Sequence, residues 1–143
     1  MGYTLQAVIG DERDFRGHVI EGAQIVPLPQ GKALMPIDED LRERFGIPFL
    51  EFGHTADALR SVTEFVALLG KKKLAYVEAE FFGGAGGQSS AVWTEGKLVS
   101  GPLCEDDAIN QALRLLGVTR GDSHDEFDAL GLDKHRDTED WKA

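Results

Sequence analysis

The sequence predicts an α+β fold: a single domain over residues 1–143, with a mainly antiparallel sheet of about five or six strands and two principal helices packed against it. Several stretches alternate apolar and polar residues with the period of two that is typical of strands. Two longer stretches repeat apolar residues at helical spacing, and neither an internal repeat nor a linker divides the chain. With 143 residues and 42% hydrophobic content, the chain can form one core.

The N-terminal third contains mostly short extended segments. Residues 3–9 (YTLQAVI) alternate in polarity, which predicts a half-buried strand, and the polar, glycine-punctuated residues 11–22 indicate a loop or a short irregular turn. Residues 23–37 predict two short extended pieces on either side of Gln30 and Gly31. Because Pro27 and Pro29 have no backbone N–H, the first of these pieces is expected at an edge of the sheet.

Two helices are predicted next. Residues 38–46 (DEDLRERFG) have Asp38 as N-cap and Gly46 as terminator. Residues 54–73 contain the clearest helical pattern, which Thr55 is expected to cap and Gly70 to end.

The second half of the chain predicts strands followed by helices. Residues 74–82 (LAYVEAEFF) alternate, and residues 90–99 form two extended arms around a tight Glu95–Gly96 turn. Residues 105–117 predict a helix with three acids in its first turn, and Ser123 with Glu126 forms a capping box for a short helix to 131. Trp141 is expected to dock the charged tail onto the body.

Charge limits the classes of partner. The net charge is −10, and the segment from Glu105 onward contributes −6 of it, with eleven acids and five bases. Such a surface repels nucleic acid and anionic membranes but attracts a basic protein partner, although an acidic surface also serves solubility alone. No apolar run has membrane-spanning length, and no signal peptide is visible. The single cysteine, Cys104, is expected to be buried or capping, and one cysteine cannot form an intrachain disulfide. We therefore expect a cytoplasmic protein.

Glycines are concentrated in EAEFFGGAGGQSSAVW, residues 78–93. A phosphate-binding loop requires a helix directly after it, and its nucleotide-binding form also requires Lys followed by Ser or Thr. Here Gln88, Ser89 and Ser90 follow, and then a strand-like AVW. The interpretation we favour is a hairpin loop over Gly83–Gln88, in which glycines supply positive φ or a bulge, or permit close approach of a partner.

Glu78 and Glu80 point to the same side of their strand, about 7 Å apart. They suit acid/base chemistry or a metal ion, but alternating charge on a solvent-facing strand is the simpler interpretation. With Tyr76 and Phe82 they form a mixed aromatic and acidic patch, which is typical of protein-binding surfaces. No catalytic residue, metal ligand or cofactor is expected, because the histidines and Cys104 lack the required motif spacing. The predicted partner-binding residues are Tyr76, Glu78, Glu80, Phe82, Gly84, Gly86, Gln88 and Trp93.

The run YVEAEFFGGAGGQSSAVW, followed by INQALRLLGV and DEFDALGL, resembles the C-terminal half of small acidic bacterial proteins of the immunity-protein type. The resemblance implies a cytoplasmic inhibitor that binds a basic toxin and catalyses nothing. Two alternatives stay open. One is a small-ligand-binding protein or metal-assisted enzyme that uses Glu78, Glu80 and the Gly83–Gln88 loop. The other is a homo-oligomeric subunit that pairs through an edge strand near residues 23–29.

Overall fold

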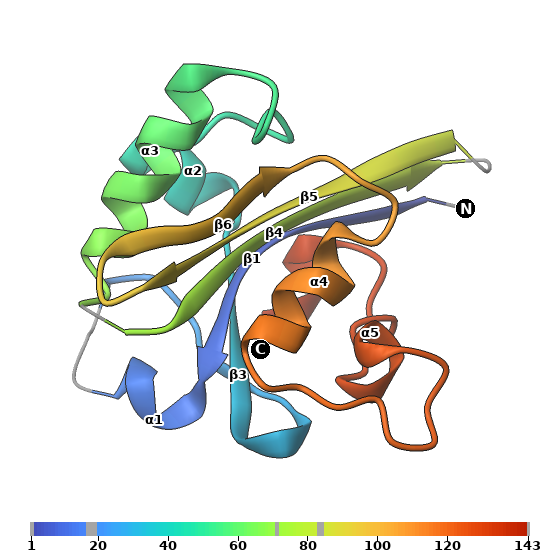
Figure 1. Cartoon of the computed structure of the whole chain (residues 1–143). Helices are drawn as coiled ribbons and strands as arrows, with labels where there is room; N and C mark the ends of the chain where they lie inside the picture. The colour runs from blue at the N-terminus through green and yellow to red at the C-terminus, as the bar shows by residue number, and fades with distance from the viewer. Residues whose placement is uncertain (1, 17–19, 71, 83–84, 143) are drawn as a thin grey trace.

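The computed structural model describes residues 2–16, 20–70, 72–82 and 85–142. It has an α+β fold built on a six-stranded sheet of strand order β2-β3-β1-β4-β5-β6, in which all neighbouring strands pair antiparallel (Figure 1). The fold class, with its antiparallel sheet and two principal helices, α3 and α4, is therefore confirmed. No helix in the described part of the chain is long and apolar enough to cross a membrane.

The bounds of the elements follow chain order. The strands are β1 Tyr3–Asp11, β2 Val26–Pro27, β3 Lys32–Pro36, β4 Leu74–Phe82, β5 Ala85–Thr94 and β6 Lys97–Leu103. The helices are α1 Glu12–Phe15, α2 Glu39–Phe45, α3 Ala56–Ala67, α4 Ala108–Leu115 and α5 Glu126–Ala129, with 3₁₀ turns η1 Pro29–Gly31 and η2 Thr138–Trp141.

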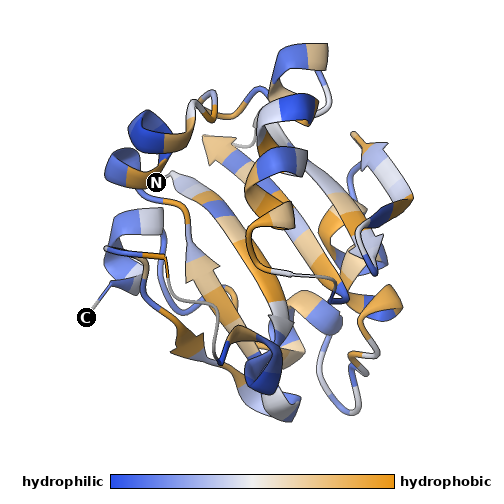
Figure 2. Cartoon of the chain, turned by 90° about the vertical axis from the view of Figure 1, so that its left-hand side faces the viewer, coloured by the Kyte–Doolittle hydropathy of each residue, from blue (hydrophilic) through white to orange (hydrophobic). Residues whose placement is uncertain are grey.

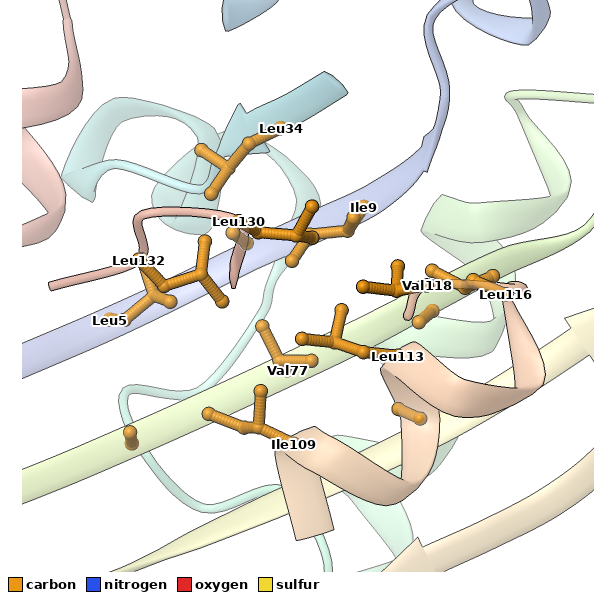
Figure 3. Close-up of a cluster of buried hydrophobic side chains, with 14 of the residues drawn as sticks. Leu5, Ile9, Leu34, Val77, Ile109, Leu113, Leu116, Val118, Leu130 and Leu132 are labelled. Carbon is orange, nitrogen blue, oxygen red and sulfur yellow. The ribbon is translucent and has the colours of Figure 1, made fainter. Parts of the chain in front are cut away.

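Helices cover both faces of the sheet. On one face α2 and α3 pack over Val8, Tyr76 and Trp93, and on the other α4 and the segment after α5 pack over a second apolar cluster (Figure 1). Figure 3 shows this second cluster, in which Ile109 and Leu113 of α4 point toward the strands. The strands are accordingly the most hydrophobic part of the molecule, with hydrophilic segments gathered in the helices and connections around them (Figure 2). The fold therefore has three layers, with the sheet between two layers of helices.

The second layer of helices changes the environment of β1. Residues 5–10 are buried on both faces, including Gln6, so the expectation of a half-buried strand is wrong. The physical reason is that the Leu5 side faces the α4 cluster while Val8, on the opposite side, faces the α2 and α3 cluster. In addition, the segment predicted as loop after β1 begins with the single-turn helix α1.

The predicted ends of α2 and α3 are close to those observed. The Asp38 carboxylate accepts a hydrogen bond from the Leu41 amide, Gly46 has a left-handed conformation (φ 66°), and the Thr55 hydroxyl accepts from the Ala58 amide. These caps satisfy amides that lack intrahelical partners.

Two predicted helix starts are wrong. The acids at 105–107 precede α4 and do not form its first turn. Asp125, and not Ser123, caps α5, because the Asp125 carboxylate accepts from the Asp128 amide; no Ser123–Glu126 capping box forms.

The C-terminal segment closes the sheet beside β1. The Thr4 amide donates to the Arg136 carbonyl, the Gln6 amide donates to the Thr138 hydroxyl, and Thr4 forms a parallel bridge with Asp137. Trp141 is buried against the α4 face, which confirms that it docks the tail.

Candidate functional site

Three of the predicted partner-binding residues lie inside the protein. Tyr76 and Trp93 are core residues that contact Phe52, at ring-centroid distances of 4.9 and 6.4 Å, and Glu78 is only 4% exposed. The expectation of a solvent-facing strand is therefore wrong for Tyr76, Glu78 and Trp93. The physical reason is that the Phe52 segment and α3 cover this face of the sheet.

The exposed part of the predicted patch is the far end of β4 and the start of β5. Glu80 is exposed, Phe82 is 75% exposed, and the neighbouring Phe81, which the prediction omitted, is 37% exposed. Whether they contact a partner stays a prediction. Gly84 lies outside the described residues.

The glycine-rich segment is mostly strand. The expectation that it joins two antiparallel strands is confirmed, since Phe82 pairs with Ala85, but residues 85–88 of the expected loop belong to β5. Gly86 has φ 141°, and a Cβ there would lie 1.9 Å from the Glu80 carbonyl oxygen. Gly86 thus permits close backbone contact between β4 and β5. The half-buried Gln88 has a structural role, because its Oε1 accepts a hydrogen bond from the Ile109 amide at the start of α4, at 2.7 Å.

Glu78 belongs to a buried hydrogen-bond network. The Tyr76 hydroxyl donates to Glu78 Oε1 at 2.7 Å, the Phe52 amide donates to Oε2 at 3.1 Å, and Gln6 Nε2 lies 3.3 Å from Oε1. Burial raises the pKa of Glu78 to about 7, although these three hydrogen bonds each lower it. Burial and the nearby Glu78 raise the pKa of Tyr76 well above its usual value, so its hydroxyl remains a donor.

A pocket of about 320 Å³ lies beside this network, where β5 extends beyond the end of β6. We call it the acidic pocket, because four carboxylate residues and no Lys or Arg are among its described lining residues. Its lining consists of Leu50, His54, Glu78, Ala79, Glu80, Gly86, Gly87, Gln88, Ser89, Cys104, Glu105 and Asp106.

The pocket owes its position to the end of β6. The ladder between β5 and β6 ends at Ser90 paired with Leu103, and the chain then turns away through Cys104, whose Sγ lies 3.3 Å from the Ser89 hydroxyl. Cys104 is exposed and the N-cap of α4 is Asp107, so the expectation of a buried or capping cysteine is wrong. In Figure 1, β5 continues past the arrowhead of β6 together with the end of β4. The acids at 105 and 106 therefore lie beside the uncovered start of β5.

The chemistry available in the pocket is that of negative charge and hydrogen-bond acceptors. Within the described residues, no group of three or more His, Cys, Asp or Glu side chains is placed to hold a metal ion. The Cys104 thiol is paired with the Ser89 hydroxyl, and none of the hydrogen bonds found among the described side chains joins it to His54. A cationic group fits this lining best.

Sequence reasoning missed His54, Cys104, Glu105 and Asp106 as members of one site. The two acids were considered only as part of the first turn of a predicted helix and of the charge of the C-terminal third, and no local motif connects them to Glu80. Comparisons with family models, with curated proteins and with solved structures find no match to this chain.

Proposed function

We propose that this protein is a cytoplasmic, acidic protein-binding module that neutralises a basic partner by direct binding, in the manner of a toxin immunity protein. The observation that carries the proposal is the acidic pocket, whose lining combines Glu80, Glu105 and Asp106 at the surface with the buried Glu78. Exposed Phe82 beside it supplies apolar contact area, as aromatic residues do at interfaces.

The overall charge supports the same proposal. A net charge of −10 accelerates encounter with a basic protein through electrostatic steering, and this advantage weakens as salt is added. The acidic pocket supplies a defined place where a Lys or Arg of that partner forms charge-assisted hydrogen bonds.

The test is calorimetric titration of the protein with the products of its neighbouring genes, and then, for any that binds, with charge-reversal variants. Glu80→Lys combined with Asp106→Lys places two bases at the pocket and is expected to weaken binding at least tenfold. The matched control reverses two exposed acids on α2 and α3 that do not line the pocket, Glu43→Lys and Glu64→Lys. Equal losses in the two double variants would show that only net charge matters and would contradict a pocket-centred site.

A second candidate function is binding of a small cationic ligand or a metal ion, with or without catalysis. It is favoured by the observation that one pocket contains Glu78, Glu80 and residues 86–88, together with His54. Thermal unfolding with Mg²⁺, Mn²⁺, Zn²⁺ or spermidine separates the two functions, because a ligand that binds only the folded state raises the melting temperature. A saturable rise that Glu80→Gln abolishes would favour the small ligand.

A further inference from the structure

The uncovered start of β5 is a sheet edge without a neighbouring strand. β5 has ten residues, but β6 pairs with it only from Ser90 to Thr94, so residues 86–89 have no strand on that side among the described residues. We call residues 86–89 the open edge. Alternate residues of a strand direct their backbone N–H and C=O groups to each side, so the open edge presents backbone donors and acceptors outward, most freely at the exposed Gly86 and Gly87, because Ser89 is buried beside Cys104.

The other sheet edges are protected in ways that the open edge is not. β2 has only two residues, of which Pro27 cannot donate, and β6 contains Pro102 and pairs with β5 through register shifts. Prolines, short strands and bulges are the usual means of preventing edge pairing. The open edge has the sequence Gly-Gly-Gln-Ser, without proline or charge. It is the stretch best suited to accept a strand.

The open edge also leaves room for a long side chain. A Cβ built on Gly87 meets no atom within 4 Å, and Gly87 pairs with Glu80 on β4. A strand added beside β5 would lie roughly 10 Å from β4, twice the usual strand spacing. Because Gly87 has no side chain, a Lys or Arg opposite it can extend across to the Glu80 carboxylate.

The negative charge around the open edge indicates which kind of strand can bind there. A second copy of this chain would bring another net charge of −10 and the same pocket acids against Glu80, Glu105 and Asp106. Like charges placed directly opposite each other are unfavourable in a sheet, whereas a basic segment complements them.

We infer that the partner binds as an added β-strand along the open edge, with a Lys or Arg side chain in the acidic pocket. This inference rests on the proposed function and specifies the recognised segment: an extended, basic stretch of about four or five residues. Backbone hydrogen bonds to residues 86–89 supply affinity, and the pocket acids supply selectivity for positive charge.

The probe that tests it is a synthetic nine-residue peptide in which Arg alternates with Val or Thr. Two further versions carry N-methyl groups on every second amide, in opposite phases, and a third replaces Arg with Glu. Strand addition uses one edge of the peptide, so one methylated phase is expected to bind at least tenfold more weakly than the other, and the Glu version is expected not to bind. Hydrogen exchange by NMR is expected to slow at alternate amides within residues 86–89.

A variant connects the result to the open edge. Gly87→Val inserts a side chain into free space on a strand, so it is expected to keep the melting temperature and to lose peptide binding. Its control, Glu64→Val at an exposed position of α3, is expected to bind the peptide like the wild type.

Several outcomes would overturn the inference. Equal binding of the two methylated peptides without slowed hydrogen exchange would overturn strand addition. It would not contradict the proposed function, which the partner titration tests separately. Failure of every peptide to bind would also overturn it, as would a dimer in sedimentation that Gly87→Val dissociates.

Discussion

Replacing the buried Glu78 by glutamine is expected to change how stability depends on pH. Burial raises the pKa of Glu78 from 4.5 to about 7 in the folded protein. Between these two values the folded state holds a proton that the unfolded state has released, so the free energy of unfolding falls as pH rises. This contribution to stability is fully present below pH 4.5 and is lost once pH exceeds about 7.

The magnitude follows from the size of the pKa change. At about 1.4 kcal/mol for each pKa unit, a rise from 4.5 to about 7 corresponds to about 3 kcal/mol. The wild type is therefore expected to lose about 3 kcal/mol more than Glu78→Gln between pH 4.5 and pH 8. Below pH 7 the protonated Glu78 already presents one acceptor oxygen and one hydroxyl donor, as the glutamine amide presents an oxygen and N–H donors, so the substitution changes the pH dependence of stability more than stability at low pH.

The assay is urea unfolding at several pH values between 4.5 and 8, followed by the fluorescence of the buried Trp93 and Trp141. Glu80→Gln makes the same chemical change at an exposed site on the same strand and is the matched control. Parallel curves of unfolding free energy against pH for the wild type and Glu78→Gln would refute the reasoning.

Two further predictions concern backbone fit and helix capping. Gly86→Ala is expected to lower the unfolding free energy by about 2 kcal/mol or more, because it combines a strained φ of 141° with a clash against the Glu80 carbonyl, whereas Gly87→Ala is expected to change it by less than about 0.5 kcal/mol. Equal melting temperatures for these two variants would contradict that assignment. Burial works to raise the pKa of Asp38, but the Leu41 amide and Lys142 together lower it below 3.8. Asp38→Ala is therefore expected to cost about 1–2 kcal/mol in urea unfolding at neutral pH, and the deficit should shrink as pH falls below 3.8; a deficit independent of pH would count against the ion pair.

Much of the fold could be predicted because its signals are local. Alternation located β4, glycine and cap residues located α2 and α3, and proline placed β2 at an edge. Each of these features depends on residues that are neighbours in sequence, so a single sequence contains the necessary information.

The candidate site could be predicted only in part, because its burial is set by distant segments. The alternating pattern Tyr-Val-Glu-Ala-Glu is the same whether its polar side faces water or is covered by a second layer of helices. Glu78 is buried because Phe52 and Gln6, 26 and 72 residues away in sequence, supply its hydrogen bonds. In the same way, no sequence pattern near Glu80 predicts that Glu105 and Asp106 line the same pocket.

The closure of the sheet by the C-terminal segment has a consequence for biosynthesis. β1 is made before the groups that cover its Thr4–Gln6 edge, because Arg136 and Thr138 lie much later in the chain. A nascent chain that has not yet reached these residues leaves that edge unpaired and Trp141 absent from the α4 face. The Thr4–Gln6 edge is therefore covered only after this stretch has emerged from the ribosome.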